Sequence, residues 1–204
     1  ASQICEKGLR YDLTVPFARF TAEHYSELYL PFKRYHIAKV WRGEKPQAGR
    51  YREFVQCDVD TVGSDTAAAD FEILNVMKSA LSAIGVDDIT INVNHRGIFN
   101  RFLSKLDLLE KSEDILRSVD KLAKVGQEAV VNELIQITQS PEKSNKIIEY
   151  ISAKGSFLEI LAQLEEMAGG PAEDTQRMKD IYNMMCASGI ESTYVLNPSI
   201  TRGL

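Results

Sequence analysis

Hydrophobic and polar residues alternate with a period of two in three stretches near the start of the chain. The stretches are FKRYHIAKVWRG at residues 32–43, FVQCDVDTVG at residues 54–63 and DDITINVNHRG at residues 87–97. Because successive side chains of a β-strand point to opposite faces, this period predicts three strands. The first two stretches are separated by a short loop and are predicted to pair as a β-hairpin.

Residues 8–20 (GLRYDLTVPFARF) are predicted to begin as a further strand. This strand would end at Val15, because the residue before a proline favours extended backbone and Pro16 follows it. A helix is then predicted over residues 17–30 (FARFTAEHYSELYL). Strands and helices are thus expected to alternate in this part of the chain.

The apolar period lengthens to that of amphipathic helices over residues 66–85 and over most of the chain after residue 96. Ser64 and Asp65 are candidate N-caps of the first of these helices, and Gly85 is expected to end it in a left-handed conformation. Further helices are predicted over residues 98–109, 113–126, 127–139, 141–155, 156–170 and 172–189, with strand character again in 192–204. The chain is therefore predicted to be α+β, with a strand-rich part over residues 1–95, an inserted helical module over residues 96–188 and a return strand over residues 189–204.

Composition narrows the class of protein. The chain has 204 residues, 44% of them hydrophobic, which is enough for one domain or two small ones. Its net charge of -5 does not attract nucleic acid as a whole, so a polyanion would have to meet the local basic cluster between Lys33 and Arg52. No stretch approaches a membrane span or a signal peptide. The cysteines are odd in number and widely spaced, which predicts no zinc site, no disulfide framework and a cytoplasmic protein.

The loop between the two clearest strands is rich in charge. Arg42 stands at one root of the hairpin and Phe54 at the other, with Arg50 and Arg52 beyond the tip. Guanidinium groups form paired hydrogen bonds with phosphate oxygens, and an aromatic ring can stack on a base. This combination suits a nucleoside triphosphate. The alternative is an exposed hairpin in which acidic residues of the loop pair with the neighbouring cations, and composition does not decide between the two.

The period of two also predicts which side chains share a face of the second strand. Phe54, Gln56, Asp58 and Asp60 fall on one face, whereas Cys57 falls on the other and is expected to be a small core residue. A buried amide and carboxylate must find polar partners. A small molecule with cationic or hydrogen-bonding groups could provide them.

These residues carry a specific resemblance. Residues 32–63 resemble the second signature of class II aminoacyl-tRNA synthetases in its histidyl version, and LRYDLTVPFARF (residues 9–20) resembles the histidyl-family segment that lines the amino-acid pocket. RSVDKLAKVG (residues 117–126) resembles the family's helical insertion, and residues 201–204 resemble the opening of its histidine-specific segment. The resemblance implies the antiparallel sheet of a class II catalytic core, present in part, with an inserted all-helical module.

The resemblance also implies an activity. Members of this family activate histidine with ATP to histidyl-adenylate and transfer the histidyl group to tRNA. Arg42 and Arg202 are the implied catalytic residues, because both would grip the α-phosphate. The implied ATP-binding residues are Arg42, Glu44 against the adenine amino group, Arg50 at the terminal phosphates and Phe54 stacked on adenine. Mg²⁺ is expected to bind with ATP, and no other metal site is implied.

The implied histidine-binding residues come from two segments. Gln56 and Asp60 lie on the hairpin, and Asp12 and Thr14 lie on the preceding strand, two residues apart and therefore on one face. These four side chains would receive the α-amino group or the imidazole of histidine. Asp12 and Asp60 each stand where many members of the family carry Glu.

Partners follow from the same resemblance. The full-length protein is expected to be a homodimer that binds tRNA specific for histidine. In the helical module the candidate contacts to tRNA phosphates are Lys105, Lys111, Arg117, Lys121 and Lys124, although interleaved acidic residues favour a solvated face. The family's first and third signatures and its anticodon-binding domain are not recognised in the chain, so the 204 residues alone are expected to be inactive in aminoacylation.

Two other functions share this ancestry. One is the synthetase-like regulatory subunit of ATP phosphoribosyltransferase, and the other is a synthetase-like module that binds tRNA without activating an amino acid. The phosphate-binding hairpin and the helical insertion argue against the first. The presence of Arg42, Phe54 and Gln56 argues against the second.

Overall fold

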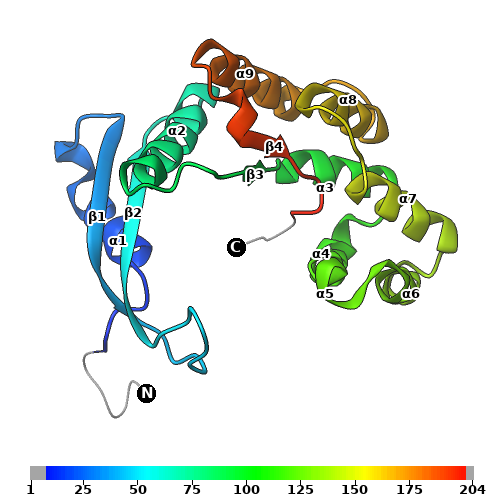
Figure 1. Cartoon of the computed structure of the whole chain (residues 1–204), viewed down its shortest axis with the longest axis horizontal. Helices are drawn as coiled ribbons and strands as arrows, with labels where there is room; N and C mark the ends of the chain where they lie inside the picture. The colour runs from blue at the N-terminus through cyan, green and yellow to red at the C-terminus, as the bar shows by residue number, and fades with distance from the viewer. Residues whose placement is uncertain (1–7, 201–204) are drawn as a thin grey trace. The chain divides into compact units, whose positions relative to one another are not determined.

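The computed structural model describes residues 8–200, apart from the side chains of Ala123 and Lys124. Internal contacts divide the chain into two units, Ala1–Ala69 and Asp70–Leu204, and each is described by itself. Figure 1 labels the helices and strands of both units.

The first unit is built on the predicted hairpin. Strand β1 (Phe32–Trp41) pairs with strand β2 (Glu53–Val62) in an antiparallel ladder, so the prediction from the period of two is confirmed. The register places Ala38 opposite Gln56 and Val40 opposite Phe54. Ahead of the hairpin lie α1 (Thr14–His24) and the short 3₁₀ turn η1 (Tyr25–Glu27).

The predicted strand over residues 8–15 is wrong. The chain is irregular up to Leu13, and α1 begins at Thr14. Asp12 Oδ1 accepts a hydrogen bond from the Val15 backbone N–H at 3.0 Å, which satisfies a donor of the first helical turn. Pro16 fits that turn because its missing N–H would have no partner there in any case. These two local effects outweigh the preference of Val15 for extended backbone.

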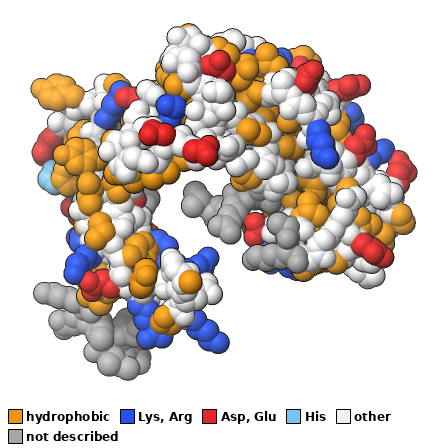
Figure 2. Space-filling view, viewed as in Figure 1, with side chains coloured by type: hydrophobic (Ala, Val, Ile, Leu, Met, Phe, Trp, Pro, Cys, Tyr) orange, Lys and Arg blue, Asp and Glu red, His pale blue; other side chains and the backbone are white. Residues whose placement is uncertain are grey.

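The core of the first unit is small. Among residues 8–69, Leu13 and Val40 are the buried hydrophobic side chains, each 0% exposed. One face of the hairpin leaves apolar side chains at the surface: Tyr35 is 76% exposed, Ile37 60% and Val55 61%. Cys57, expected in the core, is also exposed on this face. These residues occupy adjacent cross-strand positions, and Figure 2 shows hydrophobic side chains at the surface of this unit.

This exposed apolar face predicts dye binding. The 204-residue chain should enhance the fluorescence of 8-anilinonaphthalene-1-sulfonate, because contiguous exposed apolar patches bind such dyes. Replacing both Ile37 and Val55 with threonine should lower the enhancement by about half without lowering the melting temperature. Leu158→Thr, at a position 45% exposed in the second unit, is the matched control. Equal fluorescence from the double variant and the wild type would contradict the prediction.

The second unit is mainly helical. Helix α2 (Ala67–Ala83) begins just before its boundary, and Thr66, rather than Ser64 or Asp65 as predicted, accepts from the backbone N–H of Ala69 at 3.3 Å. Gly85 has a positive φ of 84°, as predicted. The later helices are α3 (Arg96–Lys105), α4 (Ser112–Val119), α5 (Leu122–Val125), α6 (Gln127–Thr138), α7 (Pro141–Ile151), α8 (Phe157–Met167) and α9 (Glu173–Ala187), with 3₁₀ turns η2 (Leu109–Lys111) and η3 (Glu191–Thr193).

The helix predictions are confirmed with one change. The single helix expected over residues 113–126 is observed as two helices, because the helical backbone is interrupted between α4 and α5. Helix α7 begins as expected from its sequence: the Ser140 side chain accepts from the Lys143 N–H and Pro141 occupies the first turn. Strands β3 (Ile91–Val93) and β4 (Tyr194–Leu196) pair in parallel. The α+β class is therefore confirmed, with an antiparallel hairpin in one unit and a parallel pair in the other.

Aromatic side chains form the centre of the helical unit. The Tyr150 ring lies 5.2 Å from that of Phe99 and 4.6 Å from that of Phe102, measured between ring centroids. All three side chains are at most 2% exposed. Burial raises the pKa of the Tyr150 hydroxyl well above its ordinary value, so Tyr150 stays neutral.

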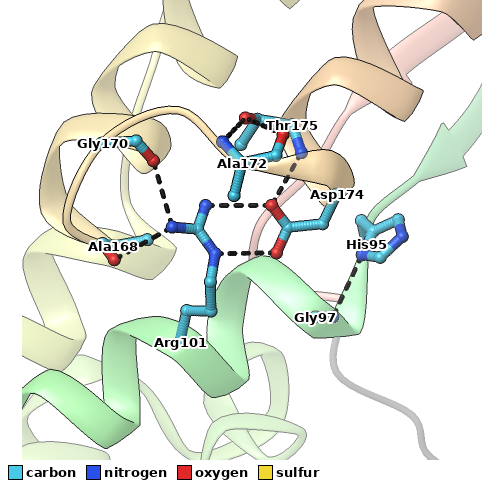
Figure 3. A network of polar contacts seen from close by, with 8 residues as sticks. All are labelled: His95, Gly97, Arg101, Ala168, Gly170, Ala172, Asp174 and Thr175. Carbon is cyan, nitrogen blue, oxygen red and sulfur yellow. Dashed lines mark hydrogen bonds and ion pairs between the residues drawn. The ribbon is translucent and has the colours of Figure 1, made fainter.

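A polar network ties α3 to the first turn of α9 and to the segment between α8 and α9 (Figure 3). The Arg101 guanidinium pairs with both oxygens of Asp174, each at 2.9 Å, and its Nη1 donates to the backbone oxygens of Ala168 at 3.3 Å and Gly170 at 3.0 Å. A Cβ atom at Gly97 would lie 3.3 Å from Asp174 Oδ2 and 2.9 Å from the His95 ring. Glycine thus lets α3 begin this close to Asp174.

A second ion pair in the same unit makes its stability depend on pH. The hydrogen bond from Lys179, and after it that from Thr175, lowers the pKa of Glu165 below its ordinary value of 4.5. Because the folded pKa is lower than the unfolded one, the stabilisation is present above pH 4.5 and is lost as the pH falls through the folded pKa.

Replacing Glu165 with glutamine should therefore lower the melting temperature at pH 7. The deficit relative to the wild type should shrink as the pH is lowered from 4.5 through the folded pKa, because the wild-type carboxylate then becomes protonated too. Thermal unfolding followed by circular dichroism at several pH values measures this, with Glu166→Gln at the neighbouring position as the control. A deficit that does not change with pH would contradict the assigned cause.

Within residues 8–200, no helix has the length and apolar character needed to cross a membrane.

Candidate functional site

Arg42 lies just after β1, between two aromatic rings. Its guanidinium carbon is 4.7 Å from the centroid of the Tyr11 ring and 5.0 Å from that of the Phe54 ring. Arg42 Nη2 donates to Gln56 Oε1 at 3.2 Å, and Nε donates to the Tyr11 backbone oxygen at 3.4 Å. The structure therefore brings Arg42, Phe54 and Gln56 together, as the sequence pattern predicted.

The Gln56 side chain has both ends of its amide occupied. Its oxygen accepts from Arg42, and its Nε2 donates to Asp58 Oδ1 at 2.8 Å. These two contacts fix which end of the amide faces Arg42. Asp58 was placed on this face by the period of two but was given no role from the sequence, because a contact two residues along a strand has no signature of its own.

Asp60 lies farther along the same face, opposite Arg34 on β1. Arg34 Nη2 is 2.8 Å from Asp60 Oδ2, and the two side chains are 13% and 26% exposed. Sequence reasoning did not identify Arg34. The available signal was its position in the strand pattern, since it shares the period-two face of the predicted pocket.

Asp12 and Thr14 do not share a strand face, and this part of the prediction is wrong. Asp12 faces the start of α1, whose Val15 N–H it accepts, and Thr14 is the exposed first residue of the helix. Backbone contacts nevertheless hold their segment beside β1: the Trp41 N–H donates to the Arg10 oxygen at 2.9 Å. Arg10 Nε in turn donates to the Lys39 oxygen at 2.7 Å. The segment thus lies beside the hairpin without forming a strand.

The loop between β1 and β2 contains an ion pair of the kind that the alternative interpretation expects. Arg50 Nη1 pairs with Glu44 Oε2 at 3.0 Å, and Arg52 Nε donates to the Glu44 backbone oxygen at 3.1 Å. Both side chains of the Arg50 pair are more than 40% exposed. Exposed pairs of this kind contribute little stability and can exchange partners readily. Lys and Arg side chains gather over this loop in Figure 2.

Glu53 anchors the second root of the hairpin. It accepts from Lys39 Nζ at 2.6 Å and from Trp41 Nε1 at 2.8 Å. These hydrogen bonds, led by that from Lys39, hold the pKa of Glu53 below its ordinary value. The loop is thereby fixed at its base while the Glu44 and Arg50 side chains stay at the surface.

A family model described as histidyl-tRNA synthetase matches residues 6–204. The chain belongs to the histidyl-tRNA synthetase family. The match includes the hairpin, the segment ahead of α1 and the helical unit.

Individual relatives agree with this assignment. The histidine–tRNA ligase of Treponema denticola is 59% identical over 203 residues, which cover 97% of this chain and 45% of that protein. The histidine–tRNA ligase of Treponema pallidum (strain Nichols) is 51% identical over 202 residues, covering 96% of this chain and 46% of that protein. The crystal structure of histidyl-tRNA synthetase from Nostoc sp. PCC 7120 superposes with a TM-score of 0.85 at 27% identity, over 96% of this chain and 46% of that one. The chain thus spans less than half the length of these relatives.

One predicted site residue of this family member, Arg202, lies outside the described residues. Residues that precede Arg202 are held by β3 and by Asn94, which follows β3. Asn94 Nδ2 donates to the Ile200 oxygen at 2.9 Å, and Asn197 Nδ2 donates to Asn92 Oδ1 at 3.1 Å. The proximity of Arg202 to Arg42 stays a prediction.

The basic residues proposed to meet tRNA in this synthetase-family chain have intramolecular partners. Lys105 donates to the Met167 oxygen, Lys111 to the Ile137 oxygen, Lys121 pairs with Glu133, and Arg117 pairs with Glu113 and Asp114. The Lys124 side chain lies outside the described residues. Their contact with tRNA stays a prediction.

A separate cavity of about 620 Å³ lies in the helical unit of the family member. It is lined by residues of α2, β3, α3 and α9, among them Asp70 and Arg177, which form an ion pair at 2.6 Å. None of the predicted site residues lines it.

Proposed function

We propose that the full-length product of the gene encoding this chain is a histidine–tRNA ligase. A carboxylate oxygen of histidine attacks the α-phosphorus of ATP, and the bond from that phosphorus to pyrophosphate breaks. A ribose hydroxyl at the 3′ end of tRNA then attacks the carbonyl carbon of the adenylate, forming the ester and releasing AMP. The contact that carries the proposal is Arg42 Nη2 to Gln56 Oε1 at 3.2 Å. It joins a phosphate-binding group to an amino-acid-binding amide on one face of the hairpin. Relatives named histidine–tRNA ligase support the same activity.

ATP would bind along the loop and its two roots. Phe54 would stack on adenine, and Arg42, already held between two rings, would donate to the α-phosphate and stabilise the charge that develops on it. Arg50 would leave Glu44 and meet the terminal phosphates, since their exposed pair is weak. Glu44 would then be free to accept from the adenine amino group. This in-line displacement requires positioning and charge stabilisation and no protein nucleophile.

Histidine would bind next to Arg42 on the same face. Gln56 and Asp60 would receive its α-amino group or imidazole from the hairpin, and Asp12 and Thr14 from the segment beside β1. Asp12 can keep its bond to the Val15 N–H through one oxygen and accept from the ligand through the other. A carboxylate facing the imidazole and a second facing the ammonium would favour a cationic amino acid.

Mg²⁺ would enter with ATP. Residues 8–200 hold no cluster of three or more His, Cys, Asp or Glu side chains that could bind a metal ion, whereas Mg²⁺ readily binds through phosphate oxygens. The ion would neutralise charge on the pyrophosphate leaving group. Arg202 would add a second guanidinium at the α-phosphate.

The remaining family properties belong to the same proposal. Residues 1–95 would form part of the catalytic core, residues 96–188 the inserted helical module and residues 189–204 the return strand. The full-length protein would act in the cytoplasm as a homodimer on tRNA specific for histidine, with the helical module near the tRNA.

Calorimetry with the full-length gene product tests the proposal. Histidine and ATP should each bind, and Gln56→Ala should weaken histidine binding about tenfold, the loss expected for one hydrogen-bonding group at a partly buried site. Gln127→Ala, at an exposed position that begins α6, should change nothing. Absence of binding by both substrates, or equal histidine affinity in the Gln56 variant, would contradict the proposed function.

A further inference from the structure

Arg34 joins three parts of the first unit. Its Nη2 lies 2.8 Å from Asp60 Oδ2 on β2 and donates to the backbone oxygen of Leu13 at 3.2 Å. Its guanidinium carbon lies 3.9 Å from the centroid of the Phe17 ring on α1. One side chain of β1 therefore contacts β2, the segment that leads into α1, and α1 itself.

The ring contact of Arg34 favours a guanidinium over another cation. The side chain is 13% exposed, so its charge must be offset by Asp60 and by polar contacts nearby. A planar guanidinium can stack on an aromatic face while its edge donates in two directions. A lysine ammonium has no such plane, so a lysine at this position could still contact Asp60 and Leu13, which one nitrogen of Arg34 contacts, but would lose the stacking on Phe17.

The Leu13 contact links the two segments that carry the proposed histidine-binding residues. Leu13 stands between Asp12 and Thr14, and its side chain is fully buried. Because Arg34 binds the Leu13 oxygen and Asp60 at once, it fixes the segment with Asp12 and Thr14 relative to the strand with Asp60. The two segments thus share one anchor.

Asp60 also has bonding capacity left for a ligand. Its Oδ2 is buried and, within the described residues, makes the ionic contact with Arg34 but no hydrogen bond of good geometry. A buried carboxylate oxygen of this kind gains from an N–H donor that approaches along its lone pair. The ammonium or imidazole of an amino acid is such a donor.

We propose that Arg34 is a positioning residue for amino-acid recognition: it orients Asp60 and holds the Asp12–Thr14 segment at the distance that a bound histidine requires. The inference rests on the proposed function and deepens it. Arg34 is not one of the proposed histidine-binding residues, yet it determines how those residues are placed. Arg34 itself does not touch the substrates.

Steady-state ATP–pyrophosphate exchange by the full-length gene product tests the role. Arg34→Met should raise the KM for histidine about tenfold or more, while the KM for ATP and kcat change less than about threefold, because uniform binding of one substrate is lost. Arg34→Lys should fall between the methionine variant and the wild type. Arg19→Met, at a side chain 80% exposed on α1, is the matched control and should match the wild type.

The outcomes distinguish a failure of the role of Arg34 from a failure of the proposed function. If the wild type catalyses the exchange and the folded Arg34→Met variant keeps the wild-type KM for histidine, the role of Arg34 is overturned while the proposed function stands. Equal increases in the KM for both substrates would show a general structural defect and would also overturn it. If Arg34→Met fails to fold, as judged by circular dichroism, the histidine KM of Arg34→Lys decides in the same way. Absence of histidine-dependent exchange in the wild type overturns the proposed function and the inference together.

Discussion

Replacing Arg42 with alanine is expected to lower the kcat of histidine-dependent ATP–pyrophosphate exchange by the full-length gene product about 10²- to 10³-fold, the usual loss when a group that stabilises transition-state charge is removed. Arg42 is held by the rings of Tyr11 and Phe54 and by Gln56. Its guanidinium is therefore already oriented before ATP arrives. The loss should appear in kcat more than in the KM for ATP, because charge on the α-phosphate is greatest in the transition state.

Two variants make the Arg42 result specific. Arg42→Lys keeps the charge but loses the planar fork, so it should recover only part of the rate. Lys45→Ala removes an exposed cation from the same loop and should leave kcat within about twofold of the wild type. A rate for Arg42→Ala within about tenfold of the wild type would contradict the role given to Arg42, provided that its circular dichroism spectrum is unchanged.

Replacing Arg101 with methionine is expected to destabilise the helical unit by about 3 kcal/mol, at the lower end of the range for removing one partner of a buried ion pair. The value is set low because Arg101 is 30% exposed, although Asp174 is only 12% exposed. Methionine fills a similar volume but leaves the Asp174 carboxylate and the carbonyls of Ala168 and Gly170 without their donor (Figure 3). Urea unfolding followed by the circular dichroism of the helices measures the loss.

A double-mutant cycle isolates the Arg101 pair. Asp174→Leu in the Arg101→Met background should recover much of the lost stability, because no unpaired charge then remains buried. Arg117→Met removes an arginine 72% exposed on α4 and should cost less than about 0.5 kcal/mol. Additive losses from the Arg101 and Asp174 changes would show that the two side chains do not act as a pair.

Local periodicity predicted much of the fold. The period of two located β1 and β2 and the face that carries Phe54, Gln56 and Asp60, because side-chain direction along a strand depends only on residue parity. Ser140 and Pro141 located the start of α7 because capping depends on neighbouring residues. Where the physical cause lies within a few residues, the sequence pattern and the structure agree.

Departures from the prediction had two causes: competing local effects of similar strength at Val15, and the absence of a signal for which strand face is covered at Cys57. Val15 was expected to be extended before Pro16, but the hydrogen bond from its N–H to Asp12 favours a helix start. Cys57 was expected in a core, yet its face of the hairpin is exposed in the structure. Alternation identifies two faces of a strand, and it does not say which face other parts of a protein cover.

Contacts between distant residues could not be predicted from local pattern at all. Arg101 and Asp174 are 73 residues apart, and Arg34 meets Leu13 at a separation of 21. Neither pair forms a spacing that a helix or strand imposes. For the site, the sequence indicated the candidate ligand-binding side chains and the strand face shared by Arg34 and Asp58, whereas the contacts through which Arg34 and Asp58 hold those side chains were visible only in the structure.

The most direct test of the account is a crystal structure of the full-length gene product with histidine and a non-hydrolysable ATP analogue. Adenine is expected to stack on Phe54, the α-phosphate to lie within hydrogen-bonding distance of Arg42, and histidine to lie between Gln56 and Asp60. Ligands bound away from this face of the hairpin, or a face filled by packed protein side chains in the presence of both ligands, would contradict it.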